Sequence, residues 1–392
     1  MTPSSGPPLN GLRVVDLSRV LAGPYCTMVL ADLGADVVKI ERPGAGDETR
    51  SWGPPYAGTE SAYYLSINRS KRSVALDLKD PRALELAVEL CKRADVVIEN
   101  FRAGAADAIG LGFEALRTAN DRLVYCSITG FGSDRQPPGR PGYDFIAQAE
   151  SGLMAITGSE EPTKVGVAMV DVLTGLHAAV AIVAALHGGG ARQIEVPLLD
   201  TALASLVNVA SGALVTGEEP RSYGNAHPHI VPYQPFRTAD GWVAVAAAND
   251  GLFRRMCDAI ERPDLAEQYP TNASRVEGRE DLIAELDALF ATRAADEWAA
   301  RLDAAGVPAG KIRGVLDAID AATDAGRDPR VVVEHPTSGA LPLIGSPIRT
   351  AGMPVPEAPP LLGQHTAEVL RECGVSDDEI RELAARGAIQ QG

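Results

Sequence analysis

The 392-residue sequence lacks the short motifs that mark several common enzyme classes. It contains no G-x-S-x-G motif of serine hydrolases, no H-E-x-x-H motif of zinc peptidases and no G-x-G-x-x-G motif of dinucleotide-binding folds. Its five cysteines are scattered and include no C-x-x-C pair. We therefore expect neither a metal site nor a disulfide framework. The cysteine content fits a protein of the reducing cytoplasm.

Long apolar runs and positive charge are also scarce. The longest apolar run, residues 178–186, is about half of the roughly 18 residues that a membrane span needs, so we expect a buried core helix there. Residues 1–10 are polar and proline-rich, with no secretory-signal pattern. Lys plus Arg number 36 against 52 Asp plus Glu, a net charge of −16. We expect neither nucleic acid nor membrane as a partner, and a phosphate-bearing ligand would require a local basic cluster.

The first half of the sequence alternates strands with helices. Its apolar segments predict strands at residues 12–17, 36–41, 73–78, 94–99 and 123–128, with helices from Pro24 to Gly34 and over residues 81–93. Strands separated by helices of this length are typical of βαβ units. The sequence therefore predicts an α/β fold with a mostly parallel sheet.

The amino-acid composition changes within the second half. We predict an apolar helix over residues 171–187, a short strand at 194–196 and a helix over 198–215, followed by a polar, proline-rich passage. A strand at 242–247 and helices at 251–260, 279–290 and 295–305 indicate a small inserted α+β domain. The expected domain limits are a large domain from residues 1–197 and 317–392, a linker at 198–223 and a small domain at 224–316.

Four polar or basic stretches lie beside the predicted strands, at residues 18–24, 39–47, 68–72 and 97–104. In a parallel sheet we expect them to converge on one rim, where their cations could hold phosphate groups. Taken one at a time, each could also be a solvated turn or a helix start. Glu41 could be the ribose-binding acid of a dinucleotide site, but the required glycines are missing.

A fifth stretch places one carboxylate, Asp171, at the head of the most apolar helix. Asp is a favoured N-cap residue, so a purely structural role is one interpretation. The other is a nucleophile, because a helix N-terminus favours an ionised carboxylate and its N–H groups can hold developing negative charge. At neutral pH an ordinary aspartate is already ionised.

Together these stretches resemble the class III CoA-transferases, the family also known as L-carnitine dehydratase/bile acid-inducible protein F. The resemblance covers the chain from about Leu9 to the C-terminal helix. It rests on residues 9–16, 33–41, 68–72, 95–101, 142–144, 224–228 and 363–366.

The resemblance implies a Rossmann-like large domain built from both chain ends, a small inserted domain and an interlocked homodimer. It implies that Asp171 is the catalytic residue, that coenzyme A is a substrate and that no cofactor is needed. It also implies a flap near residues 224–227, with Asp144, Asn225 and His227 as possible substrate-positioning residues. The implied CoA-binding residues are Arg19, Val20, Ala22, Arg42, Lys71, Arg72, Asn100, Phe101 and Tyr143.

The expected activity is CoA transfer from an acyl-CoA thioester to a free carboxylic acid, and the resemblance favours a short acid or a dicarboxylate such as succinate. Asp171 would form an anhydride and then a CoA thioester. Two alternatives remain open at this point: racemisation of 2-methylacyl-CoA, and CoA binding without catalysis. Related racemases carry a histidine before the aspartate where this chain has Tyr143, a poor base at neutral pH.

Overall fold

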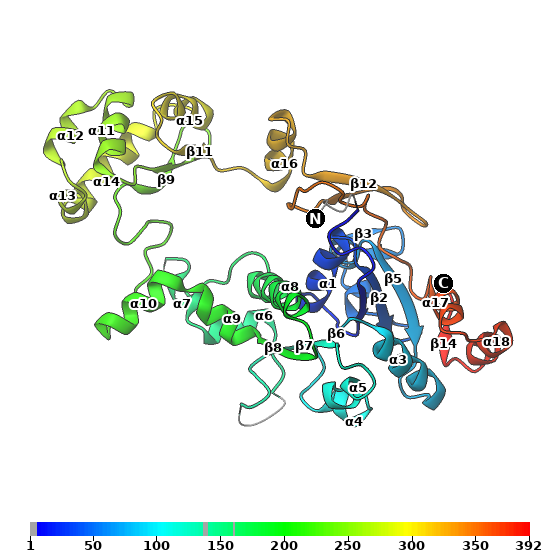
Figure 1. Cartoon of the computed structure of the whole chain (residues 1–392). Helices are drawn as coiled ribbons and strands as arrows, with labels where there is room; N and C mark the ends of the chain where they lie inside the picture. Colours follow the sequence, from blue (N-terminus) through cyan, green and yellow to red (C-terminus); the bar gives the residue numbers. More distant parts are fainter. Residues whose placement is uncertain (1–5, 136–139, 160) are drawn as a thin grey trace. The chain divides into compact units, whose positions relative to one another are not determined.

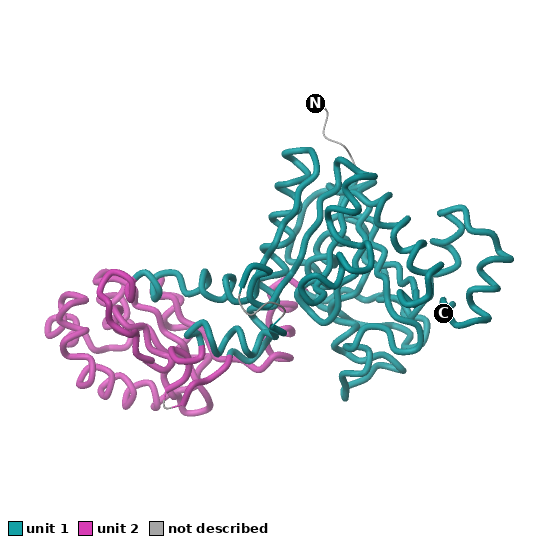
Figure 2. The backbone as a smooth tube through the Cα atoms, turned by 90° about the horizontal axis from the view of Figure 1, so that it is seen from below, with its two compact units in different colours: residues 1–153, 165–211, 329–392 teal, residues 154–164, 212–328 magenta. Residues whose placement is uncertain are grey.

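The computed structural model describes residues 6–135, 140–159 and 161–392. The chain forms two compact units, which Figure 2 distinguishes by colour. The first contains residues 1–153, 165–211 and 329–392, and the second contains residues 154–164 and 212–328. The main boundaries thus fall after residue 211, inside the predicted linker at 198–223, and after residue 328, later than the predicted end of the small domain at 316. Most of the predicted linker is helical.

A seven-stranded sheet forms the centre of the first unit, in the order β14-β5-β2-β1-β6-β7-β8. All neighbours in it are parallel except the short β14, which pairs antiparallel with β5. The strands are β1 (Arg13–Asp16), β2 (Asp36–Glu41), β5 (Lys71–Leu76), β6 (Val96–Glu99), β7 (Val124–Thr129), β8 (Arg192–Pro197) and β14 (Ile389–Gln390). The predicted α/β class with a mostly parallel sheet is confirmed. Successive strands extend outward on either side of β1, which creates a switch point between β1 and β6.

Helices cover both faces of this sheet (Figure 1). Alternate strand residues point to opposite faces, so Val14 packs against α1 (Ala22–Asp32) and α8 (Met169–Gly188), whereas Val15 packs against α3 (Pro81–Arg93). Both faces are buried, which explains the nearly continuous apolar strands. The remaining helices of this unit with four or more residues are α2 (Ala62–Ile67), α4 (Ala105–Ala108), α5 (Phe113–Arg117), α6 (Asp144–Glu150), α9 (Leu198–Ser205), α17 (Thr366–Glu372) and α18 (Asp377–Ala385).

Short elements complete this unit and its links to the second. They are the 3-10 helix η1 (Glu48–Ser51), the hairpin strands β3 (Tyr56–Ala57) and β4 (Glu60–Ser61), and the antiparallel pair β12 (Arg330–His335) and β13 (Gly339–Ile344). Two helices, α7 (Leu153–Ile156) and α10 (Val207–Thr216), cross the boundaries between the units. The proline-rich return after residue 344 carries no regular element until α17.

The α8 helix packs against α1 at very close range. A Cβ atom on Gly175 would lie 2.6 Å from the Ala22 carbonyl oxygen and 3.2 Å from the Cys26 nitrogen. Only glycine allows the two backbones to approach this closely. Asp171 precedes Gly175 by four residues and so lies on the same face of α8, toward the start of α1.

The bounds and the burial of α8, α9 and α10 differ from those that the sequence predicted. The predicted helix over 198–215 is two helices bent by 79°, and α8 begins two residues earlier than predicted. The prediction of a buried core helix holds for one face of α8 only, because Val180 and Val183 on that helix are exposed. By length and composition alone, α8 could cross a membrane, and α9 with α10 could form a second, bent span.

The second unit has its own core. Its antiparallel sheet has the order β11-β10-β9, with β9 (Tyr233–Arg237), β10 (Trp242–Ala246) and β11 (Ala309–Lys311). The aromatic rings of Phe236, Phe290 and Trp298 pack together in that core. Its helices are α11 (Asp250–Ala259), α12 (Pro263–Gln268), α13 (Asn272–Glu277), α14 (Arg279–Phe290), α15 (Ala295–Ala304) and α16 (Val315–Asp324).

The close contact between α1 and α8 generates a stability prediction. Replacing Gly175 with Ala should force the helices apart and lower the free energy of unfolding by about 1–3 kcal/mol. Gly188→Ala is the matched control on the same helix, because a Cβ atom there meets nothing within 4 Å. Urea unfolding of both variants tests this, and equal midpoints for the two would contradict the proposed packing constraint.

Candidate active site

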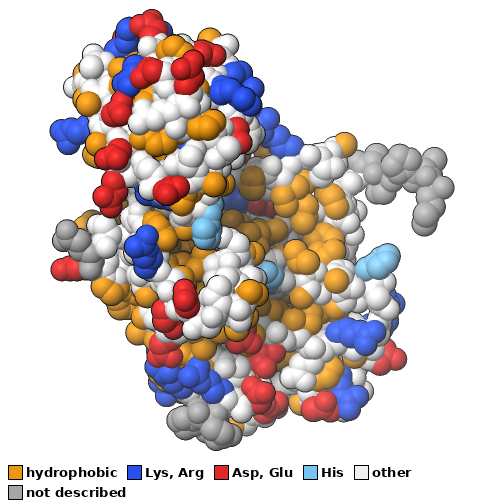
Figure 3. Space-filling model, turned by 90° about the vertical axis from the view of Figure 1, so that its left-hand side faces the viewer, with side chains coloured by type: hydrophobic (Ala, Val, Ile, Leu, Met, Phe, Trp, Pro, Cys, Tyr) orange, Lys and Arg blue, Asp and Glu red, His pale blue; other side chains and the backbone are white. Residues whose placement is uncertain are grey.

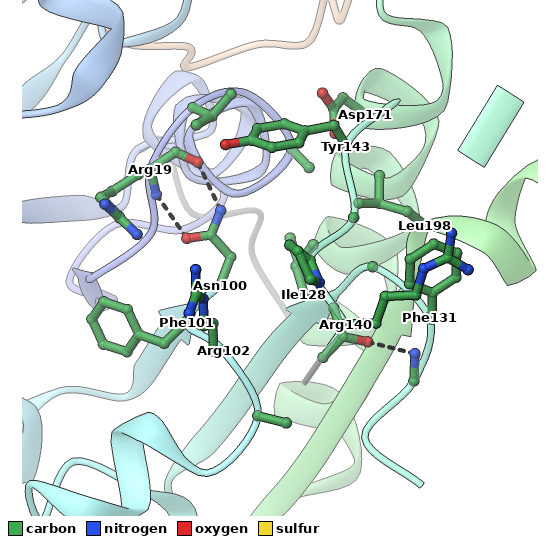
Figure 4. Close-up of a pocket in the computed structure, with 18 of the residues that line it drawn as sticks. Arg19, Asn100, Phe101, Arg102, Ile128, Phe131, Arg140, Tyr143, Asp171 and Leu198 are labelled. Atoms are coloured by element: carbon green, nitrogen blue, oxygen red, sulfur yellow. Dashed lines mark hydrogen bonds between the residues drawn. The ribbon is translucent and has the colours of Figure 1, made fainter. Parts of the chain in front are cut away.

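A pocket of about 580 Å³ lies at the carboxyl ends of the central strands in the first unit (Figure 4). Its wall comes from the loops after β1, β6 and β7 and from the first turns of α8 and α9. This is the switch point of the sheet, where open α/β folds bind ligands. The sequence-predicted residues that line it are Arg19, Val20, Ala22, Asn100, Phe101, Tyr143 and Asp171.

Hydrogen bonds fix the loops after β1 and β6 to each other. The Arg19 backbone N–H donates to Asn100 Oδ1 at 2.9 Å, and Asn100 Nδ2 donates to the Arg19 carbonyl at 2.7 Å, as the dashed lines in Figure 4 show. Val20 has a φ of 69°, a left-handed conformation that a β-branched residue rarely adopts. The Asn100 side chain therefore shapes the pocket wall, and its polar groups are directed at the neighbouring loop.

Asp171 is the third residue of α8 and is 8% exposed. It does not cap the helix. Asp144, the first residue of α6, does so instead: its Oδ1 accepts from the Val170 N–H at 2.8 Å and the Asp171 N–H at 3.3 Å. The N-cap interpretation of Asp171 is therefore wrong, and the capping role belongs to Asp144.

Burial, and next the nearby charge of Asp144, raise the pKa of Asp171 from 3.8 to about 7. One pKa unit corresponds to about 1.4 kcal/mol, so this rise amounts to roughly 4 kcal/mol. A helix N-terminus offers a carboxylate only about 0.3–1 kcal/mol in the opposite direction. The expectation that Asp171 is fully ionised at neutral pH is corrected, because burial outweighs the helix dipole.

A second pocket of about 340 Å³ shares Arg19, Glu48 and Phe101 with the first. Arg42 lines this second pocket and not the first. So does Lys79, which sequence reasoning missed although it follows the carboxyl end of β5. The two cations make this neighbouring pocket suitable for phosphate groups.

Lys71 and Arg72 do not join either pocket, which corrects their predicted role. The Lys71 side chain is fully buried, and its Nζ donates to Asp16 Oδ2 at 3.3 Å, to the Pro24 carbonyl and to Asn68 Oδ1. Arg72 is paired with Asp36, Glu368 and Glu372. Both residues begin β5, so they lie at the amino end of a strand whose carboxyl end faces the site.

Two further arginines that line the first pocket, Arg135 and Arg140, were not predicted, whereas Arg102, which also lines it, lies in the stretch at residues 97–104 that the sequence indicated. The guanidinium carbons of Arg135 and Arg140 lie 4.7 and 4.3 Å from the centre of the Phe131 ring. Arg140 also pairs with Glu150. These residues concentrate positive charge at the pocket of a chain that carries a net charge of −16.

Asn225 and His227 belong to the second unit. The His227 backbone N–H donates to the Tyr233 carbonyl, and Arg279 donates to the His227 carbonyl. Their predicted role in substrate positioning stays a prediction. Within residues 6–135, 140–159 and 161–392, no group of three or more His, Cys, Asp or Glu is arranged to hold a metal ion.

Known proteins match this chain along almost its full length. Residues 9–366 match the sequence model of CoA-transferase family III. Human succinyl-CoA:glutarate CoA-transferase is 42% identical over 402 residues, covering 98% of this chain and 90% of the human protein. Succinate–glutarate CoA-transferase from Agrobacterium fabrum is 40% identical, covering 94% of this chain and 96% of that protein.

A solved structure agrees with these matches. The crystal structure of a CaiB/BaiF family protein from Brucella suis has a TM-score of 0.84 and 38% identity to this chain, covering 94% of this chain and 99% of that one. The sequence and structural matches agree with the resemblance carried by the motifs. This chain belongs to CoA-transferase family III.

Proposed function

We propose that this enzyme transfers CoA from an acyl-CoA to a free dicarboxylate, with Asp171 as the nucleophile. The observation that carries the proposal is the placement of Asp171, a nearly buried carboxylate in a pocket that four arginines also line. Relatives that act on succinate and glutarate support the dicarboxylate class. The arginines at the pocket suit the diphosphate of CoA and a second carboxylate of the acid.

The reaction balances without an external acid or base. An Asp171 oxygen attacks the thioester carbonyl, the C–S bond breaks, and a mixed anhydride and CoA thiolate form. The thiolate then attacks Asp171 Cγ, which releases the donor acid and leaves CoA on Asp171 as a thioester. The acceptor carboxylate attacks that thioester, giving a second anhydride and thiolate. The thiolate finally attacks the acceptor carbonyl, which forms the new acyl-CoA and restores the Asp171 carboxylate.

The protein's contribution is to dehydrate and aim the nucleophile. A carboxylate removed from water loses hydration that would otherwise have to be shed during attack. The N–H groups of Val170 and Asp171 are occupied by Asp144, so they do not serve the oxyanion role that the sequence suggested. The racemase alternative has less support, because Tyr143 stands before Asp144 and the relatives named above are transferases.

The first test removes the nucleophile. Asp171→Ala should abolish transfer from succinyl-CoA to glutarate, while the affinity for CoA by titration calorimetry stays within about twofold of the unaltered protein, because the Arg19–Asn100 wall is intact. Mass spectrometry should detect covalently bound CoA on the unaltered enzyme only. Asp200→Asn is the control, since Asp200 is an exposed aspartate in the first turn of α9. Undiminished transfer by Asp171→Ala would refute the assignment, and α-deuterium exchange without transfer would favour racemisation.

The raised pKa of Asp171 predicts a pH-dependent stability effect. In the folded state Asp171 holds its proton up to about pH 7, whereas in the unfolded chain it loses it near 3.8. Stability is therefore lost as pH rises between these values. Asp171→Asn should raise the free energy of unfolding by up to roughly 4 kcal/mol at pH 8 and leave it nearly unchanged at pH 3. Urea unfolding across this range checks it, and a pH-independent difference between the two proteins would contradict it.

We further propose that the enzyme works as a homodimer in the cytoplasm. The α10 helix has no buried residues, and Leu214 and Val215 on it are 85% and 86% exposed. Apolar side chains also gather on the face drawn in Figure 3. An apolar helix that its own chain leaves uncovered supports burial against a second subunit, and the family resemblance suggests interlocked subunits.

Sedimentation velocity tests the assembly. We expect one dimeric species that survives dilution, because interlocked subunits separate only on unfolding. Because separation requires unfolding, the double substitution Leu214→Glu and Val215→Glu should lower the urea midpoint at which the dimer dissociates, since it places charge in the apolar contact. A monodisperse active monomer would refute the dimer, and flotation of the protein with lipid vesicles would indicate that a membrane covers this surface instead.

A further inference from the structure

Gln148 is a fully buried polar residue of α6 that lies outside both pockets. Its Nε2 donates to Asp144 Oδ2 at 2.6 Å, and its Oε1 accepts from the Val165 backbone N–H at 2.9 Å. Val165 is where the chain re-enters the first unit, four residues before α8 begins. One side chain therefore connects α6 both to the segment that leads into α8 and to the cap of that helix.

Asp144 forms hydrogen bonds both to Gln148 and to the backbone at Asp171. Its two carboxylate oxygens are divided between two tasks: Oδ2 accepts from Gln148, and Oδ1 accepts from the N–H groups of Val170 and Asp171. Asp144 is itself nearly buried. A carboxylate held at both oxygens has one orientation, and that orientation sets the first turn of α8.

We propose that Gln148 is a positioning residue for the transfer reaction: through Asp144 and Val165 it fixes the turn of α8 that aims Asp171 into the pocket. The inference rests on the proposed function, because it assumes that the Asp171 carboxylate is the nucleophile. A displacement of the reacting group by about 1 Å can lower the rate of a reaction about a hundredfold.

The two hydrogen bonds require an amide at position 148. A backbone N–H can only donate, so Gln148 Oε1 must face Val165, and this leaves Nε2 to face the Asp144 carboxylate. A glutamate of the same shape keeps the acceptor but cannot donate when it is ionised. A leucine of similar size keeps neither bond.

Charge near Asp171 makes the role of Gln148 measurable. Asp144 lies close enough to raise the pKa of Asp171, after burial itself, and Tyr63 on α2 has its own pKa raised to about 12, first by burial and next by Asp171. Tyr63 therefore stays neutral at physiological pH. Other titratable groups on the elements packed against α8 are Tyr25, Cys26, Asp32, Tyr125, Cys126, Glu150, Arg192, Glu195 and Asp200.

The experiment uses Gln148→Glu and Gln148→Leu in the full-length enzyme, with succinyl-CoA and glutarate as substrates. Both should lower kcat by about ten- to a hundredfold. The KM for succinyl-CoA should change by less than about threefold, because the loops that carry Arg19 and Asn100 are unchanged. Gln148→Glu should also move the acidic limb of the kcat profile upward by about one pH unit, since two carboxyl groups must then share a proton beside Asp171.

Thr366→Val is the matched control. Thr366 is also fully buried and accepts a hydrogen bond from the Ala75 N–H of β5, a strand that lies two positions from β1 on the side of the sheet away from β6. It should lower the melting temperature without moving the pH profile. If Gln148→Glu and Gln148→Leu behave like this control, or retain the kcat of the unaltered enzyme, the positioning role is overturned. Transfer that survives in Asp171→Ala overturns the proposed function instead, so the two failures are distinguishable.

Discussion

The contact between the backbones of α1 and α8 at Gly175 is the constraint on which the site depends. It seats the first turn of α8 above the switch point between β1 and β6, and it places Asp171 one turn away on the same helical face. Arg19 and Val20 lie in the loop that leads into α1, and Ala22 is the first residue of that helix, so these pocket residues come from the α1 side of the same contact. A side chain at position 175 would disturb the nucleophile and the pocket wall together.

Buried ion pairs support the loops that surround this contact. Lys39 pairs with Asp47 at 2.9 Å, and its Nζ also donates to the Ser18 carbonyl, so the loops after β1 and β2 are tied to one fully buried ammonium. Arg50 connects Glu41 with Glu60. Such pairs add little net stability once the cost of desolvation is included, but removing one partner leaves the other charge buried and unpaired. Their effect here is to specify loop geometry at the carboxyl edge of the sheet.

The sequence predicted the sheet and seven of the residues that line the first pocket, because apolar strands and the residues that follow them can be recognised locally. Asn100 and Phe101 follow β6 and were found in this way. The errors at Lys71 and Arg72 came from treating a basic stretch before a strand like one after it; the direction of β5 sends Lys79, not Arg72, to the site. The cap that Asp144 places on α8 and the bond from Val165 to Gln148 join residues 17 to 27 positions apart, and no local pattern reveals such contacts.

In the helix that carries Asp171, the N–H groups of Val170 and Asp171 are satisfied by another carboxylate, that of Asp144, and this arrangement suits the chemistry. An anhydride is more reactive than a thioester, so attack by an ordinary carboxylate is uphill. The ease with which a carboxylate leaves an anhydride falls as its pKa rises, and burial beside Asp144 raises the pKa of Asp171 to about 7. An acyl group on Asp171 is therefore better matched in energy to the thioester it came from. The same burial, with the added charge of Asp144, destabilises the folded protein at high pH and brings the energies of the thioester and the anhydride closer together.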